Sequence, residues 1–221
     1  MTFPFPQMPP AASEPVTISY TDHAISTVDS NVITFSTRAI GTAAANRLVV
    51  VGVTGFNGVA LRSVLSLTVA GVSATIVKAT PGTNGAAEVW IAAVPTGATG
   101  DIVVTWSGGV QRTGIGVWAI YGASATAYDT GNSTADPLTD TINIDNGGVL
   151  IACEFSQGSG GTVTTTWTNI TENYDESIEG NTSQSGASDA FATAQTGRTI
   201  TATFSAGTVD QALAMASFRP A

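Results

Sequence analysis

Short runs in which apolar side chains occupy every second position are the feature that most restricts how this sequence can fold. In DIVVTWS (101–107), Ile102, Val104 and Trp106 alternate with other residues, and TITATFS (199–205) has the same pattern. A period of two places such side chains on one face of a β-strand. No segment of about 10 to 15 residues has a helical period, so the sequence predicts an all-β protein.

Strands are expected wherever such a run is bounded by Gly, Asn, Asp or Pro. The runs are 16–20, 32–37, 47–54, 64–70, 73–79, 88–94, 101–107, 114–121, 138–144, 148–155, 162–168, 188–195, 199–205 and 212–218. Many short strands separated by turn signals indicate an antiparallel sandwich or barrel. The polar stretch between 128 and 140 is expected to be a long surface crossover.

Residues 101–120 resemble residues 199–218 at a constant offset of 98, with Ile102 matching Ile200 and Trp106 matching Phe204. Upstream, RLVVVGV corresponds to GVLIACE at an offset near 101. This pattern predicts an internal duplication with pseudo-repeat halves of about 31–121 and 137–218. Each half would supply part of one jelly-roll-like β-sandwich, with two antiparallel layers closed over a dry interior. The alternative is that sandwich strands converge on similar patterns.

The charge and composition exclude several functional classes. A net charge of −9 argues against nucleic-acid binding and against docking on anionic membranes. No run approaches the roughly 18 apolar residues of a membrane helix, and the N-terminus lacks a signal-peptide pattern. Synthesis and folding in a cytoplasm are therefore expected. The single cysteine, Cys153, lies in an apolar run and is expected to be buried.

The stretch MTFPFPQMPPAASEP (1–15) contains five prolines, which favour an extended arm before a sandwich domain at 16–221. Its large apolar side chains predict docking on a neighbouring subunit, although packing on its own sandwich is the alternative. The predicted docking residues are Phe3, Pro4, Phe5, Pro6 and Met8.

Catalytic motifs are scarce. The only histidine, His23, lies beside an aspartate and is interpreted as a solvated or capping residue. One histidine and one cysteine cannot supply a zinc site. Glu88 and Glu154 lie in otherwise apolar strands and would form a hydrolase pair only if they faced one cleft. The alternative is that both face solvent at strand edges, and no catalytic residue or cofactor is predicted.

Two polar stretches are candidate binding sites. Trp167, with Tyr174 and Asp175 nearby, is the best candidate for an exposed glycan platform, although a structural role is the favoured interpretation. The other three tryptophans lie within apolar strands and are expected in the core. The acidic stretch ENYDESIEGN (172–181) is read as a loop that either binds calcium or is simply solvated. No metal ligand is assigned.

The succession RLVVVGV, LSLTVAGVSATIV, AEVWIAAVPTGATGDIVVTWS, GIGVWAIYGA, LTDTINIDNGGVLIACEF and ALAMASFRP resembles jelly-roll, concanavalin-like β-sandwich modules of tailed-bacteriophage virion proteins. The resemblance covers roughly residues 16–220. It implies a non-enzymatic virion component, such as a head decoration protein, head fibre or tail protein, with no cofactor. It also implies a multi-copy arrangement or homo-oligomer on the particle, with capsid or tail proteins as partners. The alternative function is a carbohydrate-binding adhesion module that recognises a host-surface glycan.

Overall fold

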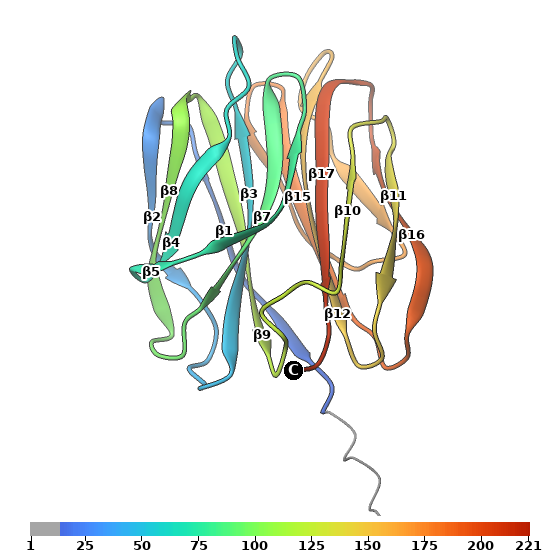
Figure 1. The fold of residues 1–221 in the computed structure, drawn as a ribbon. Coiled ribbons are helices and arrows are strands. Elements are labelled where there is room, and N and C mark those ends of the chain that lie inside the picture. The colour runs from blue at the N-terminus through green and yellow to red at the C-terminus, as the bar shows by residue number, and fades with distance from the viewer. Residues whose placement is uncertain (1–13) are drawn as a thin grey trace, which may run out of the picture.

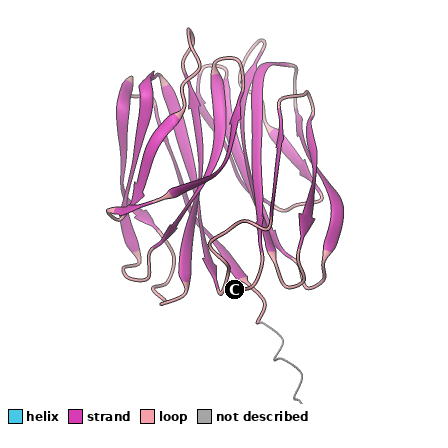
Figure 2. Ribbon diagram, viewed as in Figure 1, coloured by secondary structure: helices cyan, strands magenta, loops and turns pink. Residues whose placement is uncertain are grey.

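The computed structural model describes residues 14–221, and all regular structure in this range is β-strand (Figure 2). The first nine strands are β1 (Thr17–Ser26), β2 (Ser30–Ala39), β3 (Arg47–Phe56), β4 (Val64–Val69), β5 (Val72–Ser73), β6 (Thr75–Pro81), β7 (Gly85–Ala93), β8 (Thr99–Val110) and β9 (Arg112–Tyr121). The others are β10 (Asp129–Ser133), β11 (Leu138–Ile144), β12 (Val149–Gly158), β13 (Thr165–Thr168), β14 (Glu172–Glu179), β15 (Thr182–Ala190), β16 (Gln195–Phe204) and β17 (Thr208–Phe218). The all-β prediction is confirmed.

The strands form four antiparallel sheets. The first half of the chain makes a first inner sheet, β1-β9-β3-β7-β6, and a first outer sheet, β2-β8-β4-β5. The second half makes a second inner sheet, β10-β17-β12-β15-β14, and a second outer sheet, β11-β16-β13. Residues 14–221 contain no helix long and apolar enough to cross a membrane.

The four sheets stack as layers around three apolar cores, with the two inner sheets in the middle (Figure 1). The first core lies between the first outer and first inner sheets and contains Trp106 and Val51. The middle core lies between the two inner sheets and contains Trp118 and Ile151. The third core lies between the second inner and second outer sheets. The expected two layers over a single interior are therefore wrong, because each half of the chain is a complete sandwich.

Each half has the strand order of a jelly roll. In the first half the first and last strands pair (β1 with β9), the second pairs with the next to last (β2 with β8), and β3 lies between β9 and β7. The second half repeats this order with β10-β17-β12-β15 and β11-β16-β13. Such double Greek-key arrangements define the jelly-roll architecture.

Strand register supports the predicted internal duplication. Val51 pairs with Val117 in the first inner sheet, and Ala152 pairs with Met215 in the second. The two β3/β12 residues differ by 101 (152 − 51) and their partners by 98 (215 − 117), as the sequence offsets predict. Each repeat begins one strand earlier than predicted, because β1 and β10 pair with the last strands of their own halves.

The inner sheets are buried on both faces, which explains their continuous apolar sequences. Every residue of β3 is buried, whereas β8 in the outer sheet alternates between buried and exposed positions. The inner sheets also approach closely. A Cβ atom added to Gly52 would lie 2.8 Å from Cβ of Cys153 in the facing sheet. Glycine at this position thus allows the two sandwiches to pack directly on each other.

Three strand assignments need correction. The expected crossover at 128–140 contains β10 and the start of β11, and the acidic stretch at 172–181 forms the edge strand β14 and the turn after it. The expected strand at 188–195 spans the end of β15, a turn and the first residue of β16. The central test of the alternating pattern is confirmed, since Ile102, Trp106, Ile200 and Phe204 are all buried.

Candidate functional site

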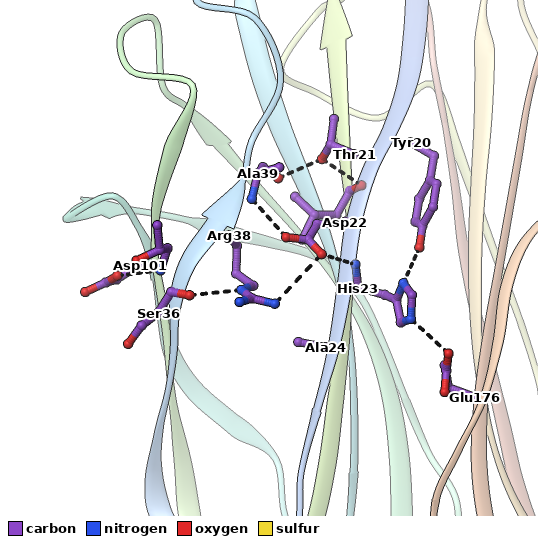
Figure 3. A network of polar contacts seen from close by, with 12 residues as sticks. Tyr20, Thr21, Asp22, His23, Ala24, Ser36, Arg38, Ala39, Asp101 and Glu176 are labelled. Carbon is purple, nitrogen blue, oxygen red and sulfur yellow. Dashed lines mark hydrogen bonds and ion pairs between the residues drawn. The ribbon is translucent and has the colours of Figure 1, made fainter.

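The most concentrated group of polar and aromatic side chains lies where the two sandwiches meet along one edge. β1 is an edge strand of the first inner sheet, and β14 is an edge strand of the second. Tyr20 and His23 come from β1, whereas Tyr174 and Glu176 come from β14. We call these four residues the interface cluster, and Figure 3 shows the polar contacts of three of them.

A β-bulge places Tyr20 and His23 on one face of β1. Residues three apart on a regular strand point to opposite faces. Here the register shifts between Tyr20 and Asp22, so Tyr20 lies opposite Trp118 and His23 lies opposite Gly116. Since partners two residues apart share a face, the extra residue of the bulge directs both side chains toward the second inner sheet.

Aromatic rings fill the space between these edge strands. The imidazole of His23 stacks on the ring of Tyr174 with centroids 5.3 Å apart and planes 3° apart. The Tyr20 ring stacks on Tyr174 as well, at 5.8 Å and 20°. The Tyr174 ring fits because Gly116 and Gly186 lack side chains: a Cβ on either would lie about 2.5 Å from its ring atoms.

Hydrogen bonds connect the cluster across the interface. The Tyr20 hydroxyl lies 2.5 Å from Nδ1 of His23, and Nε2 of His23 lies 3.0 Å from Oε1 of Glu176 (Figure 3). A neutral imidazole has one donor and one acceptor nitrogen. The arrangement fits a Tyr20 hydroxyl that donates to Nδ1 and an Nε2–H that donates to the Glu176 carboxylate.

The order carboxylate, imidazole, hydroxyl resembles a hydrolase triad, but the hydroxyl belongs to a phenol whose pKa is raised rather than lowered. Burial, followed by the charges of Asp22 and Glu176, raises the pKa of Tyr20 from 10.0 to about 12. A nucleophile requires the opposite shift or a base that removes its proton readily. The cluster joins the two sandwiches. The His23 side chain, expected to be a solvated or capping residue, is 36% exposed and bridges Tyr20 and Glu176.

A second group on β1 ties the first inner sheet to the first outer sheet. Oδ2 of Asp22 accepts a hydrogen bond from the Ala39 amide at 2.9 Å, and Oδ1 lies 3.8 Å from the Arg38 guanidinium (Figure 3). The Thr21 hydroxyl donates to the carbonyl oxygens of Ala39 and Val117. Consecutive residues of β1 thus hold three sheets together.

The residues of the predicted glycan platform do not form one. Trp167 is 9% exposed, packs in the third core and donates its indole N–H to the Ser185 hydroxyl at 2.7 Å. Tyr174 is 6% exposed and packs in the middle core, on the other side of the second inner sheet. Asp175 is half-buried and accepts a hydrogen bond from the Thr165 amide at 2.9 Å. The structural interpretation of Trp167 is confirmed.

Glu88 and Glu154 are both buried, but they face different cores. Glu88 accepts hydrogen bonds from the Val64 amide at 3.0 Å and the Trp90 indole at 2.8 Å, in the first core. Glu154 accepts one from the Thr165 hydroxyl at 2.9 Å, on the side of the second outer sheet. Burial is the main cause that raises the pKa of each carboxyl. A shared hydrolytic cleft is therefore ruled out for this pair, and so is their exposure to solvent.

The part of the chain that is described contains neither a candidate metal site nor an exposed thiol. No group of three or more His, Cys, Asp or Glu side chains is placed to hold a metal within residues 14–221. The acidic side chains of 172–179 are spread along the edge strand β14 rather than gathered in a loop. Cys153 is fully buried, and burial raises the pKa of its thiol.

The predicted docking residues Phe3, Pro4, Phe5, Pro6 and Met8 lie outside the described residues. Comparison of the sequence with protein-family models, with curated proteins and with solved structures gives no match.

The interface cluster could not be predicted from the sequence, for a physical reason. His23 and Glu176 lie 153 positions apart and meet only because two edge strands from different sandwiches run along the same side. The sequence signals that do exist are Gly116 and Gly186. Gly116 interrupts an apolar strand and Gly186 lies in a strand of small residues, each where the Tyr174 ring approaches, and strand glycines often mark such close approaches.

Proposed function

We propose that this chain is a non-enzymatic structural subunit of a bacteriophage virion. It serves as a head decoration, head-fibre or tail component and attaches to neighbouring proteins through its N-terminal residues. The jelly-roll topology agrees with the family resemblance of the sequence. The possible chemical groups also fit this role, because Glu88, Glu154, Cys153 and the interface cluster are all engaged in internal packing.

The observation that carries the proposal is the anchoring of the chain at Val16. Val16 is 3% exposed, packs in the middle core and donates its amide to the carbonyl oxygen of Gly147 at 2.8 Å. The chain is therefore fixed to both halves of the molecule directly after the proline-rich stretch. Figure 1 shows this start of the described chain at the same end as the C-terminus. The apolar residues proposed for attachment are therefore tethered at Val16 to a rigid body.

Multiple copies would make weak attachment sufficient. Linked binding events on one particle gain avidity without any new contact. A four-layer body with three dry cores supplies the rigidity that a repeated surface subunit needs. Neither a cofactor nor an exposed catalytic group is required for such a role.

Incorporation into particles tests the proposal. Virions are assembled in the presence of the full chain, or of a variant in which residues 1–13 are replaced by a Gly/Ser segment of equal length. Antibody against the folded body should label particles that contain the full chain, and labelling should be lost with the variant. Thermal unfolding of the two proteins should be equal, because every described residue of the three cores lies after residue 15. Equal labelling, or no labelling with either protein, would refute the proposed role.

A further inference from the structure

Exposed large apolar side chains gather at one end of the first sandwich. Six of the ten such residues in the described chain belong to this group. They are Ile25 (39% exposed), Val28 (62%), Val32 (46%), Val59 (82%), Leu61 (39%) and Leu65 (65%). We call them the apolar tip. Contiguous exposed apolar surface on a soluble protein commonly marks a binding surface.

Strand register shows that these six residues lie at the same end. Ser26 pairs with Thr113 and Phe56 with Arg112, so β1 and β3 both end where β9 begins. Ser30 pairs with Val110, which brings the start of β2 to the same place. The β1–β2 and β3–β4 connections are therefore neighbours. Figure 1 shows the β3–β4 connection projecting at the end away from the C-terminus.

The equivalent end of the second sandwich is different. The connections that correspond by topology are 134–137, 159–164 and 205–207, with the sequences TADP, SGGTVT and SAG. Val163 is the only large apolar residue in these three connections, and it is buried. In the adjoining strand ends the one exposed large apolar residue is Val209, at the start of β17, against six in the apolar tip. Both halves share the same jelly roll, so the fold itself does not require the exposed apolar residues of the first tip. Their presence calls for a partner.

The charge of the apolar tip limits the kind of segment that can bind it. Within the connections of the apolar tip the charged side chains are Asp29 and Arg62, which sum to zero, whereas the whole chain carries −9. A neutral, apolar segment fits this surface better than a charged one. Residues 1–13 have this composition: they contain Phe3, Phe5, Met8 and four prolines, and no charged side chain.

Reach prevents Phe3, Phe5 and Met8 from covering the tip of the same molecule together. Phe3 and Phe5 precede Val16 by 13 and 11 residues and are long enough to span β1 when extended, but Met8 is not. Val16 is anchored at the end of β1 opposite the tip, and the ten residues of β1 span about 33 Å. Met8 precedes Val16 by eight residues, so it reaches at most about 28 Å even when fully extended. Met8 therefore cannot contact its own tip, whereas the tip of a second copy stacked below is accessible.

We propose that the apolar tip binds residues 1–13 of another copy of this chain, so that copies associate head to tail. This inference rests on the proposed attachment role of the N-terminal residues and names their partner. Such contacts are heterologous, because two different surfaces meet, and they generate rings or filaments rather than closed twofold dimers. Phe3, Phe5 and Met8 supply the side chains that cover the tip.

Sedimentation velocity over a range of concentrations tests the proposal. The full chain should self-associate. Deletion of residues 1–13 should abolish association, and so should the double substitution Val59→Asp and Leu65→Asp. Val209→Asp is the matched control, because Val209 is 59% exposed near the end of the second sandwich. This control should associate like the unchanged chain, and thermal unfolding should show that all variants are folded.

Mixing the deletion variant with the double variant gives the decisive result. The deletion variant retains the tip and the double variant retains residues 1–13, so neither should self-associate while an equimolar mixture should form a one-to-one complex. Monomers at every concentration for the full chain, association of the deletion variant through tip-to-tip contact, or association of the double variant would each overturn the proposal. None of these results would refute the virion role, which depends on labelled particles. No labelling of particles by a full chain that self-associates normally would refute the virion role and leave the head-to-tail contact standing.

Discussion

The carboxyl groups of Glu88 and Glu154 point in opposite directions from two strands that pack on each other. Sγ of Cys153, the residue before Glu154, lies 3.5 Å from the carbonyl oxygen of Glu88. The Glu88 side chain nevertheless turns into the first core and the Glu154 side chain into the third. Both oxygens of Glu88 are paired, whereas Oε2 of Glu154 has no hydrogen-bond partner among residues 14–221.

This difference predicts opposite responses to the same substitution. Glu88→Gln places an NH₂ group against the Val64 amide or the Trp90 indole, both of which are donors, and should lower the free energy of unfolding by about 1–3 kcal/mol. Glu154→Gln can keep the acceptor for the Thr165 hydroxyl and replaces a carboxyl whose ionised form is disfavoured by burial, so it should raise the free energy of unfolding at neutral pH. Urea unfolding of both variants measures the contrast. Equal losses would contradict the assigned pairing.

Glu154 also predicts a pH dependence with a definite sign. Burial raises its pKa above the usual 4.5, so the folded protein holds the proton more tightly than the unfolded chain. Its contribution is complete below pH 4.5 and is lost as the pH rises through the folded-state pKa. Glu154→Gln should therefore flatten the fall in stability as the pH rises above 4.5. Glu14→Gln, an exposed control, should leave the slope unchanged.

The outer sheets could be predicted from sequence, whereas part of the inner sheets could not. Outer strands such as β8 have one wet and one dry face, so their apolar residues alternate visibly. β15, with the sequence TSQSGASDA, is buried along most of its length but is built from Ser, Gly and Ala. Small residues suit the close packing of the inner sheets and give no hydrophobic signal. The unbroken apolar run of β3 was the available sign that a sheet is covered on both faces.

Gly52 tests the close approach of the inner sheets. A methyl group there would lie 2.8 Å from Cβ and 3.1 Å from Sγ of Cys153, and both atoms sit in rigid, fully buried surroundings. Gly52→Ala should cost about 1–3 kcal/mol of unfolding free energy because the sheets must separate. Gly160→Ala adds a methyl with nothing within 4 Å and should change stability by less than about 0.5 kcal/mol. A neutral Gly52→Ala would mean that the sandwiches are less tightly packed.

Tyr20 provides a test of the interface cluster at alkaline pH. Its pKa is raised from 10.0 to about 12, so its contribution to stability is present below pH 10 and is lost as the pH rises toward 12. Tyr20→Phe should remove this part of the alkaline loss. At neutral pH the same variant should lose about 0.5–1.5 kcal/mol with the hydrogen bond to His23. Tyr128→Phe, at a tyrosine 43% exposed, is the control and should behave like the unchanged protein.

Asp210 holds one sandwich to the other by a single carboxylate. It lies on β17 of the second half, is 5% exposed, and accepts the backbone amides of Thr83, Asn84 and Gly85 in the β6–β7 turn of the first half at 2.7 to 2.8 Å. Asp210→Asn turns one acceptor into a donor that faces an N–H group, so at least one of the three hydrogen bonds is lost. We expect a loss of about 1–3 kcal/mol.

Amide hydrogen exchange locates the effect of this substitution. Exchange at the three turn amides should accelerate in Asp210→Asn, because that turn opens more often when its acceptor is removed. Asp145→Asn is the control, since within residues 14–221 the Asp145 carboxylate accepts only the amide of its exposed neighbour Asn146, and the variant should leave the turn protected. Unchanged protection of the β6–β7 turn in Asp210→Asn would show that other contacts position it, and that the two sandwiches are held by the middle core without this carboxylate.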